Sequence, residues 1–460
     1  MDLDKSGEAV LSPVSSGALP PSGPGLQSPK SGGQSRPAGR DAPTPLSHTP
    51  SALSLILARG RVRAALAILG PAFVAAVAYV DPGNFATNFK AGSEHGYLLV
   101  WVVVMANLMA MLVQYLTSKL GLATDRSLPE LCHELFPKRA NAMLWVQAEA
   151  IAMATDLAEF TGAAVGLNLV FGLPLFLAGL VTAVVAFVIL GLEQRGYRRF
   201  ELAIIALLLL VALGFVVDFF AVGGQSYSGI AKGLVPRLGG GDTIALAVGI
   251  VGATVMPHVV YLHSALQKNR IQPVDRHERR ALLKYNKLDV VVGLGLAGIV
   301  NLAMLCIAAA LFHHPGLTRI NDLGPVHAHL ASMVGGAAAL AFGVALIASG
   351  LSASSVGTYS GQIVMAGFMN WRIPLVVRRG LTMIPSLLVL GLAVNTTNAL
   401  VYSQIVLSFG IPFALVPLVL VSSRREVMGE MVNHALTSRV MWLVTGIITA
   451  LNIYLLVTLL

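Results

Sequence analysis

Residues 78–85 read AYVDPGNF and interrupt an apolar run that is long enough to cross a membrane. Proline removes a backbone donor and clashes with the preceding helical turn, and glycine frees the backbone. A second apolar run contains GATVMPH at residues 252–258, again with a proline in its middle. Irregular backbone at membrane depth is tolerated only where it lines a cavity. The two stretches therefore predict two broken transmembrane helices that face a central site.

The composition of the whole chain places these helices in a lipid bilayer. Of its 460 residues, 55% are hydrophobic and 12% are charged, and the mean hydropathy is +0.75. Soluble domains usually carry about 25% charged residues. A chain with so little polar surface is expected to be an all-α integral membrane protein, because a lipid environment requires internally bonded backbone.

Eleven apolar blocks follow one another after residue 60. Their approximate ranges are 64–90, 97–120, 141–170, 174–192, 199–221, 242–266, 287–312, 333–366, 379–396, 398–421 and 439–460. A span of the hydrocarbon core needs about 20 residues. The broken blocks are the first and the sixth, which is typical of an inverted repeat around a central site. We therefore predict repeats over about 64–221 and 242–421, with an extra helix at 439–460.

Residues 1–55 form a different region, rich in Ser, Pro and Gly. Such a segment buries too little apolar surface to offset its ordering entropy, so we expect a disordered tail. No apolar core follows its start, so it does not resemble a signal peptide. The transporter domain is expected over residues 60–460.

The Lys and Arg residues between the blocks are distributed unequally. With a cytoplasmic N-terminus, 23 fall on the cytoplasmic side: Arg59, Arg61, Arg63, Lys119, Arg126, Lys138, Arg139, Arg195, Arg198, Arg199, Lys268, Arg270, Arg276, Arg279, Arg280, Lys284, Lys287, Arg372, Arg378, Arg379, Arg424, Arg425 and Arg439. Four fall outside: Lys90, Lys232, Arg237 and Arg319. Positive residues favour the cytoplasmic side, so this predicts an inside N-terminus and an outside C-terminus. The net charge of +9 is thus a topology signal and does not indicate a nucleic-acid partner.

The two breaks offer a mixed set of metal donors. Asp81 supplies an anionic oxygen, Asn84 a neutral oxygen and Met256 a thioether sulfur, and freed carbonyls of Ala78 and Ala253 add further oxygens. This mixture suits Mn²⁺, Fe²⁺ and the softer Cd²⁺, whereas Mg²⁺ and Ca²⁺ prefer all-oxygen shells. A lone Met more often packs, and a lone Pro more often kinks a helix. A carboxylate at mid-bilayer, however, is costly and marks a functional site. Cys132 and Cys306 match no metal or redox spacing.

Further ionisable residues lie within the blocks: Asp156, Glu159, His258, His263, Arg378 and Arg379. The two acids are three residues apart and share a helix face. Such groups inside membranes form proton relays, or else buried structural ion-pair networks. Three other polar residues are expected to be mostly structural: Glu149, Asp218 and Asn301.

The pair DPGN (81–84) and MPH (256–258), followed by YLHS at 261–264, resembles the Nramp family of proton-coupled divalent metal transporters, of the bacterial manganese and iron type. The resemblance covers about residues 60–460 and implies a LeuT-type fold. It implies metal binding by Asp81, Asn84, Met256 and the Ala253 carbonyl, with the Ala78 carbonyl and Gln404 contributing in some conformations. It assigns proton movement to Asp81, Asp156 and Glu159, with Arg378, Arg379, His258 and His263 alongside. Many members carry Asn where this chain has Val259.

These observations predict a secondary symporter that takes Mn²⁺, Fe²⁺ or Cd²⁺ into the cytoplasm with protons across the plasma membrane. We expect no permanently bound cofactor and no enzymatic activity, and no Walker-type phosphate loop occurs. An amino-acid symporter on the same fold is the alternative, although Asp81 would repel a substrate carboxylate. A membrane metalloenzyme using His258 and His263 is a third reading, but these two residues lie on different helix faces and no HExxH motif occurs.

Overall fold

The structure of the chain is a computed structural model, which describes residues 52–58, 60, 68–194, 197–268, 275–314, 322–371, 373–392 and 394–459. These residues belong to the unit Pro50–Leu460. Seven of the basic residues used for the topology lie outside the described residues: Arg59, Arg61, Arg63, Arg195, Arg270, Arg319 and Arg372. Most of the predicted disordered tail, residues 1–55, also lies outside the described residues. Its last residues are helical instead of disordered, because α1 (Ala52–Leu57) begins within the predicted tail.

Helices make up nearly all of the described chain, which contains no strand in these ranges. They are α3 (Pro71–Ala78), α4 (Pro82–His95), α5 (Val100–Thr124), α6 (Leu128–Leu135), α7 (Lys138–Phe171), α8 (Leu175–Gln194), α9 (Tyr197–Val222), α10 (Tyr227–Gly233), α11 (Gly241–Thr254), α12 (Pro257–Leu266), α13 (Arg276–Phe312), α14 (Leu323–Met333), α15 (Gly336–Met369), α16 (Leu375–Gly391), α17 (Thr396–Ser422), α18 (Arg425–Met428) and α19 (Ala435–Leu459). The all-α prediction is confirmed.

Each of the eleven predicted blocks overlaps a helix or, for the first and sixth, a pair of helices. Within the described ranges, eight helical stretches are long and apolar enough to cross a membrane, and α8 holds a shorter apolar stretch. The number of complete crossings therefore stays a prediction. The largest boundary difference is at α13, which begins at residue 276 instead of 287. Asp275 caps this start by accepting a hydrogen bond from the Glu278 N–H, and hydropathy does not detect such a polar first turn.

The packing of the helices follows an inverted repeat. The broken pair α3–α4 packs against α13, the second helix of the other repeat, and α11–α12 packs against α5, the second helix of the first. In the same way, α9 packs against α15 whereas α17 packs against α7. The third helices of the two repeats, α7 and α15, form the most extensive contact. Exchanging the repeats reproduces these contacts, as the LeuT-type prediction requires.

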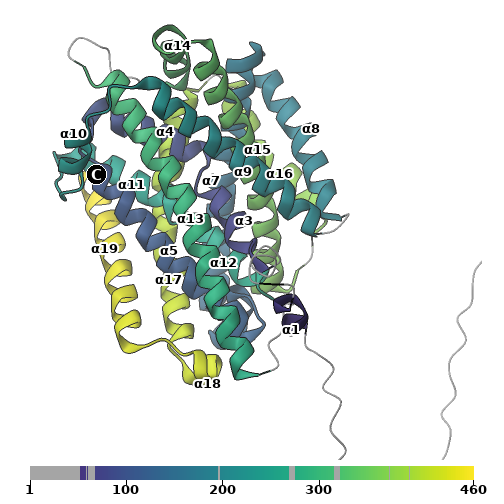
Figure 1. Cartoon of the computed structure of the whole chain (residues 1–460). Coiled ribbons are helices and arrows are strands. Elements are labelled where there is room, and N and C mark those ends of the chain that lie inside the picture. The colour runs from purple at the N-terminus through teal and green to yellow at the C-terminus, as the bar shows by residue number, and fades with distance from the viewer. Residues whose placement is uncertain are drawn as a thin grey trace, which may run out of the picture. The chain divides into compact units, whose positions relative to one another are not determined.

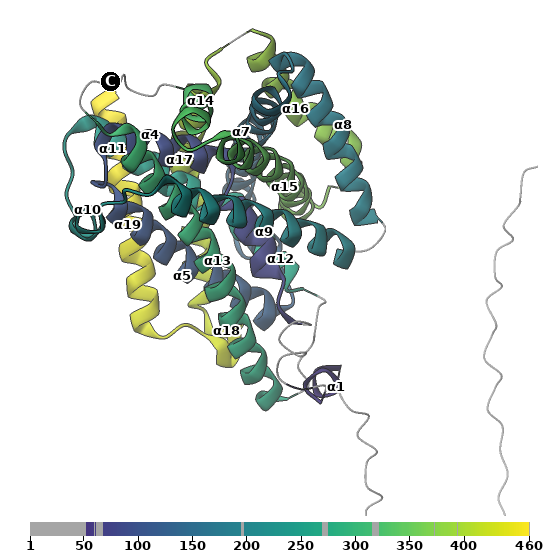
Figure 2. The ribbon, with the colours of Figure 1, turned by 45° about the horizontal axis from the view of Figure 1, so that its top comes forward.

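Two views show how the remaining helices are arranged around this core. In both, α19 lies on one flank of the helices and α8 on the opposite flank (Figures 1 and 2). The helices α10 and α14 lie at one end of the bundle and α1 and α18 at the other (Figure 1). This grouping agrees with the predicted topology, which assigns α10 and α14 to one side of the membrane and α18 to the other.

The two halves of the first broken helix are held by different contacts. Phe85 and Phe89 of α4 pack against Phe215 of α9 and Phe342 of α15, with ring centroids 4.9–6.3 Å apart. The start of α3 is held by Asp289 of α13, which accepts hydrogen bonds from Gly70 N (3.0 Å) and Ala72 N (2.9 Å). Aromatic packing therefore fixes α4, whereas one carboxylate fixes the start of α3.

Candidate functional site

Both broken helices contain a proline four residues after an alanine. An α-helical carbonyl accepts from the N–H four residues later, and proline has no N–H to give. Pro82 therefore leaves the carbonyl of Ala78 without its helical partner, and Pro257 does the same to Ala253. The chain leaves the helix between these pairs and re-enters it at α4 and α12. The sequence thus creates two carbonyls without a helical N–H partner, at corresponding positions of the two repeats.

Asp81 occupies the N-cap of α4 and is fully buried. Its carboxylate accepts hydrogen bonds from the backbone N–H of Gly83 (3.1 Å) and of Asn84 (2.9 Å). An anionic side chain is stabilised at a helix N-terminus by these free donors and by the helix dipole. The cap fixes the position of the carboxylate at the break, where the freed carbonyls also lie.

The amide side chains of Asn84 and Gln404 flank this carboxylate. Asn84 Nδ2 donates to Asp81 Oδ1 (2.6 Å) and to the Ala253 carbonyl (2.9 Å), so it joins the two broken helices. Gln404 Nε2 of α17 donates to Asp81 Oδ2 at 3.4 Å. A Cβ at Gly83 would lie 1.8 Å from Gln404 Nε2, so only glycine allows this approach.

The oxygens of these two amides lack partners. Among the described residues, neither Asn84 Oδ1 nor Gln404 Oε1 has a hydrogen-bond partner, although both are buried. A buried acceptor without a donor is costly and requires an explanation. Two such oxygens beside a carboxylate and a freed carbonyl form a set of acceptors that a cation would satisfy.

Met256 is the N-cap residue of α12 and is fully buried. It occupies in the second break the position that Asp81 occupies in the first, one residue before the proline. Its side chain makes no capping hydrogen bond. In the described part of the chain, no three His, Cys, Asp or Glu residues gather as a metal cluster. Hydrogen bonds join the Asp81 carboxylate, the amides of Asn84 and Gln404 and the Ala253 carbonyl, and Met256 follows that carbonyl by three residues. Oxygen donors of these kinds together with a thioether suit a first-row or softer divalent ion.

Side chains from other helices support the unwound backbone of the first break. Asn301 Nδ2 of α13 donates to the Tyr79 carbonyl (2.8 Å), and its Oδ1 accepts from Asn88 Nδ2 (3.1 Å). The Ser349 hydroxyl of α15 donates to the Val80 carbonyl. The structural role predicted for Asn301 matches this geometry. Nothing in the sequence singles out Ser349, since a serine in an apolar helix usually bonds its own backbone.

Asp156 and Glu159 project from α7 toward the same part of α15. A Cβ at Gly357 would lie 2.7 Å from Glu159 Oε2 and 3.4 Å from Asp156 Oδ1. Glycine at this position therefore leaves room for both carboxyl groups. Glu159 is fully buried, and within the described residues neither of its oxygens has a hydrogen-bond partner. The part of the chain that the structure describes thus supplies no donor for either oxygen of Glu159.

The two arginines of α16 have separate partners. Arg379 is fully buried and donates through Nη1 to Asp156 Oδ1 (3.1 Å) and to the Thr358 hydroxyl (2.8 Å). Arg378 instead forms a bidentate pair with Glu149, with N–O distances of 3.1 and 2.8 Å. Arg379 therefore accompanies the acids of α7, as predicted from the resemblance, whereas Arg378 belongs to another ion pair. The charge distribution predicts both arginines among the cytoplasmic charges between the blocks, but both are buried within α16.

The two histidines of α12 lie in separate environments. His258 Nδ1 is 3.3 Å from the Thr155 hydroxyl of α7, directly beside Asp156 in the chain. His263 Nδ1 is 2.8 Å from Gln114 Oε1, and Gln114 Nε2 donates to the Tyr79 hydroxyl (2.6 Å). His258 thus connects the second break to the helix that carries the acids. Gln114 was not predicted, although a glutamine within a membrane block is itself a signal of a polar contact.

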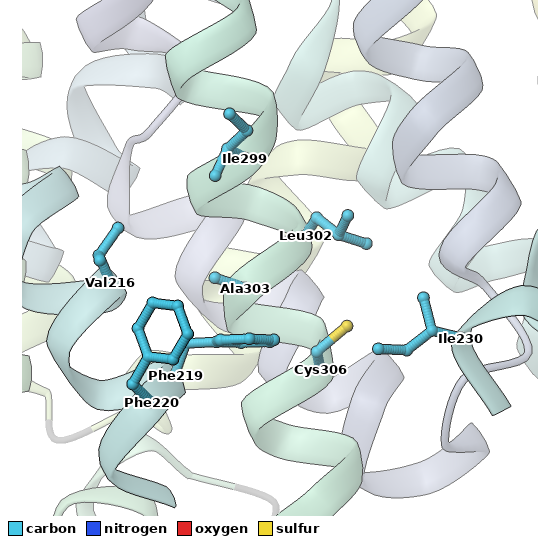
Figure 3. Close-up of a pocket in the computed structure, with 8 residues that line it drawn as sticks. All are labelled: Val216, Phe219, Phe220, Ile230, Ile299, Leu302, Ala303 and Cys306. Atoms are coloured by element: carbon cyan, nitrogen blue, oxygen red, sulfur yellow. The ribbon is translucent and has the colours of Figure 1, made fainter. Parts of the chain in front are cut away.

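An apolar pocket of about 230 Å³ lies away from these groups, between α9, α10 and α13. Figure 3 shows Phe219 and Phe220 beside Ala303 and Cys306 on its walls. Its lining offers one thiol and no carboxylate or amide. It therefore lacks the donors for a cation site, and the polar groups at the two breaks are the candidate site.

Comparisons with known proteins agree with this geometry. The profile of the Nramp family, described as natural resistance-associated macrophage protein-like, matches residues 72–458. The chain is 48% identical to the divalent metal cation transporter MntH of Deinococcus radiodurans over 395 residues, covering 86% of this chain and 90% of that protein. It is 47% identical to MntH of Bacillus subtilis over 396 residues, covering 86% and 93% respectively.

Solved structures extend the comparison to the fold. A crystal structure of the Eremococcus coleocola manganese transporter, in complex with an aromatic bis-isothiourea substituted compound, matches with a TM-score of 0.76 and 30% identity, covering 85% of this chain and 86% of that one. Mhp1, a nucleobase-cation-symport-1 family transporter, shares the fold alone, with a TM-score of 0.56 and 14% identity over 85% of this chain and 91% of that one. The chain is therefore a multi-pass membrane protein that belongs to the Nramp family.

Proposed function

We propose that the chain is a secondary symporter that imports divalent transition-metal ions, Mn²⁺ or Fe²⁺ and also Cd²⁺, into the cytoplasm together with protons. Asp81, Asn84, Met256, Gln404 and the carbonyls of Ala78 and Ala253 provide the metal donors. The observation that carries the proposal is the pair of unpartnered oxygens, Asn84 Oδ1 and Gln404 Oε1, on either side of the buried carboxylate.

The relatives support a metal as the cargo, since they are named as divalent metal cation transporters and as a manganese transporter. The donor types narrow the choice of metal. A thioether is a poor ligand for Mg²⁺ and Ca²⁺, which prefer oxygen ligands, but it suits softer ions. We therefore propose that Met256 disfavours the abundant hard ions.

The energetics favour inward transport. An inside-negative potential of 100 mV contributes about 2.3 kcal/mol for each positive charge that moves inward. A dication gains twice this amount, and a proton moving with it adds to the gain. Uptake at low external metal concentration therefore needs no hydrolysis of a nucleotide.

We propose that protons use the acids of α7. Glu159 is buried without a partner and lies with Asp156 against Gly357, and Asp156 is bonded to Arg379. A proton on Glu159 would remove the cost of burying a charge for which the described residues provide no donor. Arg379 would hold Asp156 in position, and His258, through Thr155, would connect the metal site to this region. His263, through Gln114, and Arg378, through Glu149, lie beside this route.

An amino-acid symporter on the same fold is the competing proposal. Such a carrier holds the substrate carboxylate at exposed helix N-termini. Here the N-terminus of α4 is already occupied by the carboxylate of Asp81, which accepts from Gly83 N and Asn84 N. The like charge would repel an amino acid at this place, so the structure favours a cation.

The test is competition uptake in proteoliposomes that contain the purified chain and a pH-sensitive dye. We expect Mn²⁺ uptake that acidifies the lumen and is inhibited by Fe²⁺ and Cd²⁺ but only weakly by Mg²⁺ and Ca²⁺. Uptake of metal without acidification would contradict the proposed coupling of metal import to proton movement. Inhibition by an amino acid but by none of the metals would favour the competing symporter.

A further inference from the structure

A second cavity, of about 420 Å³, lies on the helices that carry the candidate metal donors, α4, α11 and α17. Its walls include charged side chains and one aromatic side chain: Lys90, Glu94, Asp242 and Tyr402. The three helices contact one another in pairs. The cavity is therefore lined by the same three helices that carry Asn84, Ala253 and Gln404.

The spacing along the helices places the cavity beyond the site. Lys90 follows Asp81 by nine residues on α4, which corresponds to about 13 Å along the axis. Asp242 precedes Ala253 by eleven residues on α11, or about 16 Å. Both displacements point to the end of the bundle at which α10 and α14 lie (Figure 1). Asp81 and Gln404 do not line the cavity and are fully buried, so protein separates them from a cation in the cavity.

The charges of the cavity do not neutralise one another by direct contact. Among the described residues, no carboxylate lies within ion-pair distance of the Lys90 ammonium. Glu94 instead lies 3.9 Å from His95 Nε2. Lys90 is part-exposed and Asp242 is exposed. One ammonium therefore acts together with two carboxylates on the space that a cation would enter.

We propose that Lys90 limits how strongly this cavity attracts divalent cations, and so sets the apparent affinity for uptake without choosing the metal. This inference rests on the proposed transport of divalent ions. A cleft lined by one sign of charge concentrates ions of the opposite sign, and a lysine in it opposes that effect. The interaction scales with the charge of the ion, so it acts equally on Mn²⁺ and Cd²⁺. The donors at the two breaks, which touch the ion, decide between metals.

The experiment compares the KM for Mn²⁺ and Cd²⁺ uptake in proteoliposomes at ionic strengths of about 10 mM and about 300 mM, where the Debye length falls from roughly 30 Å to below 10 Å. At the lower ionic strength, Lys90→Gln should reduce both KM values on the order of threefold, leaving their ratio unchanged. Glu94→Gln should raise them, and Lys90→Arg should leave them unaltered. At the higher ionic strength the differences should disappear.

Lys232→Gln is the matched control, because it removes the same charge from α10, outside the lining of this cavity. It should change the KM clearly less than Lys90→Gln does at the lower ionic strength and leave it unaltered at the higher one. The inference is overturned if Lys90→Gln has the KM of the unmodified chain, or if its effect persists at high salt or appears in Lys90→Arg, since packing would then be the cause. Absence of uptake by the unmodified chain would instead contradict the proposed function.

Discussion

The two broken helices share one backbone design and differ in the side chain at the break. Residues 78–82 read AYVDP and residues 253–257 read ATVMP, so alanine, valine and proline recur at matching positions. Both prolines free the carbonyl of the alanine four residues earlier. The break therefore depends on the positions that the two repeats share.

The chemistry resides in the positions that differ. The first repeat places Asp81 at the N-cap, where it receives two backbone hydrogen bonds, and the second places Met256 there with no capping bond. Asn84 follows in the first repeat, whereas Val259 follows in the second. Under the proposed function, one repeat would supply charge for any divalent ion, while the other would supply a sulfur that discriminates between ions.

The largest expected effect tests the charged half of this comparison. Asp81→Asn removes the only carboxylate at the breaks while retaining an oxygen that can cap α4. Mn²⁺ uptake should fall at least about 100-fold, since even residues that merely orient metal ligands are worth about 10–100-fold. Uptake in proteoliposomes measures the effect, and size-exclusion chromatography in detergent checks the fold. Uptake near that of the unmodified chain would refute the assignment of Asp81.

The second prediction tests whether the acids of α7, and not the residues at the two breaks, carry the protons. Glu159→Gln should reduce metal-linked proton flux to near background while retaining Mn²⁺ binding, because Glu159 makes no hydrogen bond with a donor at the breaks. Calorimetry measures the binding, and a pH dye in the liposomes measures the flux. Equal loss of binding and flux would place Glu159 in the metal site.

Asp156→Asn provides the contrast, because it leaves Arg379 buried without its counter-ion. Breaking a buried pair from one side costs about 3–5 kcal/mol. We therefore expect a clear fall in thermal stability for Asp156→Asn and little change for Glu159→Gln, measured by unfolding in detergent. The same stability in both variants would show that the pair with Arg379 is not structural.

The third effect tests the sulfur of the second break. Met256→Ala should reduce Cd²⁺ uptake about tenfold, reduce Mn²⁺ uptake less and admit Ca²⁺ better, because a water can replace sulfur only for the harder ions. Uptake of the three ions at matched protein levels gives the comparison. If neither Cd²⁺ nor Ca²⁺ transport changes, Met256 is a packing residue.

The smallest effect concerns a contact just beyond the end of α12, the second half of the second broken helix. Lys268, just beyond α12, donates to Glu130 of α6 at 2.8 Å. Burial acts to raise the pKa of Glu130, but the hydrogen bonds from Lys268 and the Ser127 N–H hold it below the ordinary value. A depressed pKa gives stability that is present above the ordinary pKa of 4.5 and is lost as the pH falls through the lower value in the folded state.

Glu130→Gln retains a side chain that can complete the capping box, so it isolates the ion pair. It should lower stability by only about 0.5 kcal/mol at pH 7, because about a third of each partner is exposed. The difference should vanish once the pH has fallen below the lowered pKa of Glu130 in the folded state. Glu134→Gln is the control, since its pair with Arg126 is more exposed. A loss that is independent of pH would exclude the ion pair as the cause.

The sequence predicts the helices and the two breaks because hydropathy and proline act locally. The resemblance adds Gln404, which the structure brings to Asp81. The partners across helices were not predictable, because they depend on packing. The bidentate pair of Arg378 with Glu149 and the bond of Ser349 to the first break join residues 229 and 269 positions apart in the chain. No local pattern of charge or hydropathy carries that information.

The freed carbonyls have a genetic consequence. Every residue has a backbone oxygen, whatever its side chain. Gly or Ser at residue 78 or 253 would therefore supply the same atom. The carbonyl at each of these positions is free of its helical partner only because a proline, Pro82 or Pro257, follows four residues later. Replacement of either proline by alanine would restore a backbone N–H, which would donate to the carbonyl four residues earlier. No side-chain metal donor would be altered. Loss-of-function alleles of this half of the site should therefore map to residues that never touch the ion.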